Sequence, residues 1–168
     1  VVVIKATDSN NNISRQTITV SISDIADEIA PTISGVTSST SDGTYKVGDS
    51  ISINVAFSES VTVDTTNGTP TLELETGDTD RTATYSSGSG SSTLVFTYTV
   101  QSGDTASDLD YTSTSALSLN NGTIKDAAGN NATLTLPTVG GSSSLAGSSA
   151  LVIDGVIPTV TGPSSSTG

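Results

Sequence analysis

The stretch ISINVAF, residues 51–57, alternates apolar and polar side chains without interruption. Its apolar positions are Ile51, Ile53, Val55 and Phe57. Successive side chains of a β-strand point to opposite faces of the sheet, so this alternation is typical of a strand that buries one face. The stretch therefore predicts a sheet with one face in a hydrophobic core.

The same alternation extends outward along the chain. TLVFTYTV, residues 93–100, places Leu94, Phe96, Tyr98 and Val100 on one face. Shorter strands are predicted at residues 32–37, 61–63, 71–75, 81–85, 116–119, 122–125, 132–136 and 150–154, and a loop at Asp42-Gly43. No window carries the apolar spacing of an amphipathic helix, so we expect almost no helix. Many short strands separated by turn residues predict an all-β fold, an immunoglobulin-like β-sandwich with antiparallel Greek-key connections.

Composition removes several classes of chemistry. The 168 residues contain no Cys and no His, so a Ser-His-Asp triad, a cysteine nucleophile and a His/Cys zinc site are all excluded. The net charge of −12 disfavours nucleic acid and anionic membranes as partners, although it suits cations. No apolar run approaches 18 residues, so we expect no membrane insertion. We therefore expect a protein that is not an enzyme.

Part of the sequence occurs twice. DIADEIAPTISG at residues 24–35 is echoed by DGVIPTVTG at 154–162, and Pro31 and Pro158 are 127 residues apart. Each copy follows a strand, a turn rich in Asp and Asn, and a last strand. Self-similarity at a fixed period indicates tandem repeats. We expect residues 1–28 to hold the C-terminal strands of a preceding repeat and a linker, residues 29–155 a complete repeat, and residues 156–168 the start of the next.

Chain direction in such a sandwich predicts where acidic side chains gather. Glu59 follows the strand 51–57, and Asp126 lies in the turn before the last strands, so both should return to the N-terminal pole, the end where the chain enters. The linker with Asp24 and Asp27 enters there as well. Grouped carboxylates repel one another unless a cation neutralises them, and calcium takes six to eight oxygen ligands. We therefore predict a calcium site of Asp24, Asp27, Glu59 and Asp126. The alternative is that these acids are simply solvated.

Several stretches resemble known families. ISDIADEIAPTI resembles the cadherin linker between repeats, with Asp24 and Asp27 at its two aspartates and with Ala26 and Glu28 in place of its asparagines. VGDSISINVAFSESVTV, YTVQSGDTASDLDY and GTIKDAAGNN are similar to the bacterial Ig-like and cadherin-like repeats of large secreted adhesins and hemolysin-type calcium-binding proteins. The resemblance implies a secreted or cell-surface spacer that supports adhesion and that calcium stiffens at its junctions. Its partners would be neighbouring repeats of the same chain, while other domains could recognise a cell-surface or glycan target.

Other readings stay open on the sequence alone. Asp78 and Asp80, and likewise Asp104, Asp108 and Asp110, have the spacing of calcium loops but lack the full EF-hand pattern, so turn formation is the default for them. A flat array of outward Thr side chains would favour a glycan- or ice-binding module. A neighbouring catalytic domain would make the chain a non-catalytic accessory domain of a secreted hydrolase.

Overall fold

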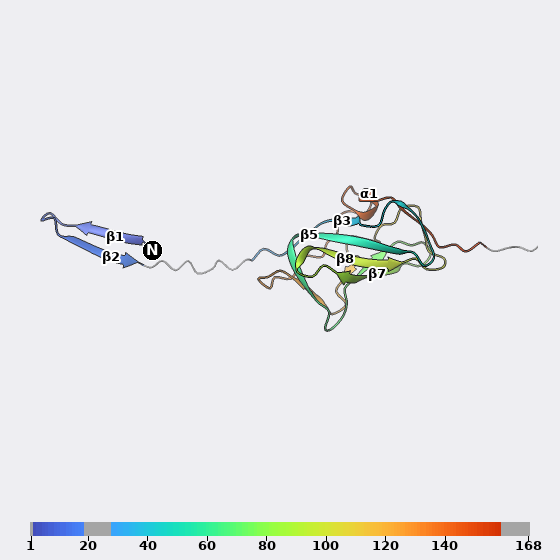
Figure 1. Ribbon diagram of the computed structural model, residues 1–168, viewed down its shortest axis with the longest axis horizontal. Coiled ribbons are helices and arrows are strands. Elements are labelled where there is room, and N and C mark those ends of the chain that lie inside the picture. Colours follow the sequence, from blue (N-terminus) through green and yellow to red (C-terminus); the bar gives the residue numbers. More distant parts are fainter. Residues whose placement is uncertain (1, 19–27, 159–168) are drawn as a thin grey trace, which may run out of the picture.

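The computed structural model describes residues 2–18 and 28–158, and nearly all of its regular structure is β (Figure 1). The strands are β1 (Val2–Thr7), β2 (Ile13–Ile18), β3 (Ile33–Ser38), β4 (Gly43–Lys46), β5 (Ser50–Asp64), β6 (Thr71–Leu74), β7 (Arg81–Ser87), β8 (Ser91–Thr99), β9 (Thr105–Ala106), β10 (Leu117–Ser118), β11 (Thr123–Lys125) and β12 (Leu151–Asp154). In these two ranges the one helix is α1 (Leu145–Ser148), which at a single turn is far too short to span a membrane.

The larger sheet is antiparallel and has the strand order β10-β6-β7-β8-β5-β11, with β3 pairing with β5 as well. The alternation predicted from sequence is confirmed along its two longest strands. Ile51, Ile53 and Val55 on β5 are fully buried, and so are Leu94 and Phe96 on β8. The intervening residues lie nearer the surface, so the pattern reports which face of each strand meets the core.

Strand β5 is longer than the sequence predicts. Two separate strands are expected, over residues 51–57 and 61–63, but β5 runs continuously through residues 58–60 between them. The pairing of β5 with β8 shifts register between Ala56, opposite Thr93, and Val61, opposite Ser91, so the extra residues of β5 form an irregular bulge. The bulge bends the strand, so that its first half pairs with β3 and its second half with β11.

The smaller sheet has the order β4-β12-β9, and it corrects the expectation of purely antiparallel pairing. Strand β4 forms where a loop was predicted, and it pairs with β12 in parallel, from Leu151 opposite Gly43 to Asp154 opposite Lys46. The pairing is parallel because β4 belongs to the first passage of the chain away from the N-terminal pole, and β12 makes the last such passage. Strand β9, which the sequence did not predict, completes the sheet on the other side of β12.

A two-residue turn closes the larger sheet on itself. Asn120 and Asn121 have φ angles of 47° and 70°, and the Gly122 amide donates to the Leu119 carbonyl, as in a type I′ turn. The turn joins β10 and β11, the strands predicted at residues 116–119 and 122–125, but these two strands do not pair with each other. Strand β10 pairs with β6 and β11 pairs with β5, at opposite ends of the strand order. Because so short a turn connects the two edges, the sheet must curl until they meet.

One hydrophobic core lies between the sheets. It includes Phe96 of the larger sheet, Leu151 and Ile153 of β12, and Leu145 of α1. Phe96 also packs edge-on against Tyr85, with ring centroids 5.9 Å apart. Because both sheets bury their inner faces in the same cluster, the architecture is the β-sandwich that the sequence predicts.

The predicted strand at residues 132–136 is wrong. Its backbone amides bond to three separate segments: Ala132 to Ile124, Thr133 to Pro31, and Leu136 to Thr114. A strand needs one continuous partner, so only isolated bridges form here. The chain then continues through a loop to α1, whose first turn is capped by the Ser144 hydroxyl accepting from the Gly147 amide.

The predicted N-terminal hairpin is confirmed as β1 and β2, which pair from Val2 opposite Ile18 to Thr7 opposite Ile13. The alternation of the second strand continues in the sequence through Val20 and Ile22, which lie outside the described residues. Within residues 2–18 and 28–158, the hairpin forms a sheet of its own.

Candidate functional site

Hydrogen bonds fasten the chain at the N-terminal pole of the sandwich. Pro31 is buried, and its carbonyl accepts from the Thr133 amide at 2.7 Å. The Thr32 amide donates to the Ser58 hydroxyl at 3.0 Å, while the Ser58 amide donates back to the Thr32 carbonyl at 2.8 Å. The incoming chain is therefore tied both to the bulge of β5 and to the segment that follows the Asp126 turn.

The structure places two of the four predicted calcium ligands near this pole. Glu59 is half-buried and directly follows Ser58 on β5. Asp126 follows β11, whose last residue, Lys125, pairs with Thr62 of β5. Asp24 and Asp27 lie outside the described residues. Residues 2–18 and 28–158 hold no group of three or more carboxylates able to bind a metal ion, so a site here would need the linker acids.

Asp126 shapes the turn that contains it. One carboxylate oxygen accepts from the Asn130 amide at 2.8 Å, and the other accepts from the Asn130 side chain at 2.7 Å. Burial acts to raise the pKa of this carboxyl, but the hydrogen bonds from Asn130 and from the backbone of Gly129 and Ala128 outweigh burial and hold the pKa below its usual value. The charged form of Asp126 is therefore favoured.

An equivalent turn joins β1 and β2. The Asp8 carboxylate accepts from the Asn12 amide at 2.9 Å and from the Asn12 side chain at 3.1 Å. The bridges beside the two turns match as well, since Thr7 pairs with Ile13 and Lys125 pairs with Asn131. Each position in the first turn recurs 118 residues later in the second.

The two turns also share their backbone geometry. The Asp8 amide donates to the Asn12 carbonyl at 3.1 Å, and the Asp126 amide donates to the Asn130 carbonyl at the same distance. Asn11 has a φ angle of 63°, and Gly129, at the equivalent position, has a φ angle of 97°. Asn is among the few residues besides Gly that adopt this conformation readily. The two turns are thus the same structural element formed by different sequences.

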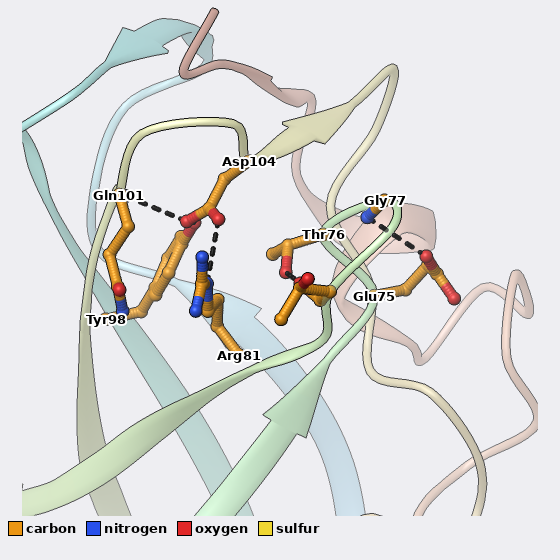
Figure 2. Close-up of polar contacts among 8 residues, drawn as sticks. Glu75, Thr76, Gly77, Arg81, Tyr98, Gln101 and Asp104 are labelled. Carbon is orange, nitrogen blue, oxygen red and sulfur yellow. Dashed lines mark hydrogen bonds and ion pairs between the residues drawn. The ribbon is translucent and has the colours of Figure 1, made fainter.

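A second polar site, which the sequence did not reveal, lies at the opposite end of the sandwich. Asp104 is only 1% exposed, and Figure 2 shows three donors converging on its carboxylate. Arg81 Nε lies 2.8 Å from one oxygen, while the Tyr98 hydroxyl at 2.6 Å and the Gln101 amide at 2.8 Å donate to the other. From its spacing alone, Asp104 is predicted to be a turn residue. The sequence signal for a buried acid is Arg81, a cation on a strand that otherwise carries no charge.

These contacts shift two pKa values in opposite directions. Burial acts to raise the pKa of Asp104, but hydrogen bonds from Tyr98, Arg81 and Gln101 outweigh it and lower the pKa. The pKa of Tyr98 is raised, first by burial and then by its bond to the Asp104 carboxylate. Around neutral pH the pair is therefore a neutral hydroxyl donating to a charged carboxylate, which the adjacent guanidinium balances.

Other acidic residues support loops. The Asp108 carboxylate accepts from the Leu151 amide, and that of Asp110 accepts from the amides of Tyr111 and Gly140. Together with Glu75 they line a cleft of about 320 Å³. Because each of these carboxylates has a backbone donor, the acids hold the cleft walls in place. Asp78 and Asp80 lie exposed in the loop after β6.

Comparison with known proteins identifies a family for the chain. Residues 27–140, more than half of the chain, match the sequence family described as a bacterial Ig-like domain. No curated protein and no solved structure matches the chain. The matched range includes the bulge of β5, the Asp104 site and the Asp126 turn, and it ends before β12.

Proposed function

The chain belongs to the family of bacterial Ig-like domains, and we propose that it is a structural spacer, one complete β-sandwich repeat in a tandem array of an extracellular or surface protein. Bacterial Ig-like domains are typically non-catalytic structural domains and often lie on the surface of extracellular proteins. An array of such repeats would hold an adhesive part of the protein away from the cell.

The observation that carries this proposal is the duplicated Asp/Asn turn. Asp8 with Asn12 and Asp126 with Asn130 form the same pair of side-chain hydrogen bonds, beside bridges of the same register. In the complete sandwich this turn directly follows β11, the strand that pairs with β5. The hairpin at residues 2–18 would occupy the same place in a preceding repeat.

We further propose that calcium stiffens the junction before Pro31. Asp24, Asp27 and Glu59 would supply carboxylate oxygens, and Asp126 would complete the set of acids around the ion. Support comes from the N-terminal pole, where hydrogen bonds tie the incoming chain to the Glu59 bulge and to the segment after the Asp126 turn. Bound calcium would neutralise the repulsion among these acids and fix the linker.

The test is calorimetric titration with calcium, combined with thermal melting in millimolar calcium and in chelator. At free calcium of 10 to 100 times the Kd, one site should add about 1.4 to 2.7 kcal/mol to the free energy of unfolding. Asp27→Asn and Glu59→Gln should each weaken binding at least tenfold. Glu75→Gln is the matched control, because the Glu75 carboxylate accepts from the Gly77 amide at the opposite end of the sandwich.

Two results would count against the calcium assignment. If the wild-type chain melts at the same temperature in calcium and in chelator, no site of this affinity exists and only the metal-free spacer survives. If calcium stabilises the chain but Glu75→Gln reduces the effect as much as Glu59→Gln does, binding lies elsewhere.

A further inference from the structure

The chain leaves the sandwich through a closely fitted backbone contact at Gly155. Its amide donates to the Asp104 carbonyl at 2.7 Å, and its carbonyl accepts from the Gly103 amide at 3.0 Å. A β-carbon at Gly155 would come within 2.3 Å of the Gln101 carbonyl oxygen and 2.8 Å of the Asp104 carbonyl oxygen. These are backbone atoms that cannot move aside, so only glycine fits.

The buried Asp104 carboxylate holds this contact in place. The turn that grips Gly155 runs from Gln101 to Asp104, and Asp104 fixes it through the Gln101 amide, the Tyr98 hydroxyl and Arg81 (Figure 2). We call this arrangement the Gly155 clamp. Because its anchor lies in the interior, the clamp sets the direction in which the chain leaves the sandwich.

Little chain separates the clamp from a following repeat. Pro158 repeats Pro31, which is buried and hydrogen-bonded in this sandwich. Only Val156 and Ile157 therefore lie between two fixed positions, and three residue steps span at most about 10 Å. These two apolar side chains are 58% and 61% exposed. At so short a distance the next sandwich must lie directly over them.

The two linkers of the chain differ at the clamp position. Glu28 stands 127 residues before Gly155, and its side chain could not fit against a turn like the one that grips Gly155. The first linker thus has an acid where the second has a glycine held by backbone contacts. The second linker lacks a second acid but has a fixed direction of exit.

We propose that the C-terminal pole is an interface for a following repeat of the same kind, which packs end to end on the Gly155 clamp, buries Val156 and Ile157, and keeps its orientation without calcium. This inference rests on the proposed spacer function. It adds to that function that the two junctions are stiffened differently, the first by calcium and the second by direct contact between repeats. Figure 1 agrees with an end-to-end arrangement, because the described chain enters and leaves at opposite ends of the sandwich.

The test uses a protein in which residues 1–158 are followed by residues 32–168, so that Pro158 also serves as Pro31 of the second copy. The natural sequence has no cysteine, so Thr82→Cys in both copies provides two unique spin-label sites on β7. Double electron–electron resonance then measures the distribution of distances between the two spin labels, which lie on either side of the junction. In chelator we expect a narrow distribution, at least twofold narrower than when Gly-Ser-Gly-Ser is inserted after Gly155.

Substitutions show whether a narrow distribution depends on the Gly155 clamp or only on folded sandwiches. Gly155→Ala should broaden the distribution, while Gly35→Ala should not, because a β-carbon there meets Ser143 at an ordinary 3.7 Å. If Gly155→Ala fails to fold, Val156→Asp with Ile157→Asp serves instead, because both side chains lie outside the sandwich. A parent distribution in chelator as broad as that of the insertion variant would overturn the proposal.

The labels report only on the second junction, so the outcome is independent of the calcium titration of the natural chain. A distribution that is narrow only with calcium would overturn the metal-free interface and leave the spacer proposal standing. If the natural chain melts at the same temperature in calcium and in chelator while the second junction is narrow in chelator, the calcium proposal fails and the metal-free interface stands.

Discussion

The Cα atom of Gly68 lies so close to the carbonyl oxygen of Asn120 that a β-carbon on Gly68 would come within 1.6 Å of it. The contact is reciprocal, since a β-carbon on Gly122 would come within 2.4 Å of the Gly68 carbonyl oxygen. The turn after β5 therefore locks against the type I′ turn between β10 and β11. This contact fastens the curled sheet where its two edges meet.

Gly68→Ala should destabilise the sandwich, because the new methyl group can be accommodated only if one of the two turns moves. Overpacking of this kind costs about 2 to 3 kcal/mol in free energy of unfolding, measurable by urea titration. Gly35→Ala is the control and should change stability by less than about 1 kcal/mol. Equal effects of the two substitutions would show that the contact between the turns does not hold the sheet.

Asp104→Ala should lower the free energy of unfolding at pH 7 by about 3 kcal/mol, because it leaves Arg81 and Tyr98 without their buried partner. The lowered pKa of Asp104 also fixes the pH dependence. Its contribution is fully present above the unfolded value of about 3.9 and is lost as the pH falls through the folded value. The difference between wild type and Asp104→Ala should therefore shrink below about pH 4. A difference that is constant from pH 7 to pH 3 would contradict the assignment.

The shared geometry of the two Asp/Asn turns predicts which residues can be exchanged. Gly129→Asn should be tolerated, because Asn11 adopts the same left-handed conformation at the equivalent position and nothing lies within 4 Å of a β-carbon at Gly129. Gly129→Val should cost at least about 1 to 2 kcal/mol, because a β-branched residue is strained there. Thermal melting should give Gly129→Val a lower melting temperature than Gly129→Asn. Equal melting temperatures would show that position 129 does not require the left-handed conformation.

Asn130→Ala should lower the melting temperature by the same amount in calcium and in chelator, because it removes the side-chain donor to Asp126 in either condition. Glu59→Gln should instead act only when calcium is present. Melting both variants in the two conditions therefore separates the residue that shapes the turn from the proposed ligand. A larger effect of Asn130→Ala in calcium than in chelator would mean that Asn130, by holding the Asp126 carboxylate, also supports the proposed site.

Tyr111→Phe should cost about 1 kcal/mol, because the Tyr111 hydroxyl donates to the Pro137 carbonyl at 2.7 Å. Burial, with the neighbouring Asp110, raises the pKa of Tyr111 to about 12. The stabilisation that this shift reflects is complete below the unfolded value of about 10 and fades as the pH approaches 12. Tyrosinate absorbance of wild type and Tyr111→Phe should differ only above pH 11, and a difference already at pH 10 would contradict the shift.

The sequence predicted the parts of the fold that depend on local pattern. Alternation at residues 51–57 and 93–100 identified the buried faces of β5 and β8, because a period of two depends only on neighbouring residues. The paired stretches around Asp8 and Asp126 identified equivalent turns, because an Asp/Asn turn also depends only on residues close together in the chain.

Features that depend on distant partners were missed. The stretch around Ser58 reads as a break between strands, yet pairing with the incoming chain at Thr32 keeps β5 continuous. Strand β4 forms where turn residues predicted a loop, because β12 supplies its partner. Residues 132–136 alternate like a strand but have no single neighbour along their length.

The candidate sites follow the same division. Chain direction predicted that Glu59 and Asp126 belong to the N-terminal pole, because it needs only the order of the strands. The role of Asp104 could not be read from its spacing, because it depends on Arg81, 23 residues away, and on the burial of both. Asp104 lies at the end of the sandwich opposite to Glu59 and Asp126.

The parallel pairing of β4 with β12 determines when the protein can finish folding. Asp42 and Ala150, bonded at the start of this pair, are 108 residues apart in the chain. At a synthesis rate of about 5 to 20 residues per second, β12 emerges from the ribosome roughly 5 to 20 seconds after β4. During that interval β4 has no strand to join, and the inner face of the larger sheet lacks its cover. Each repeat of an array would thus be completed by its own last strand, one repeat at a time, before the next begins.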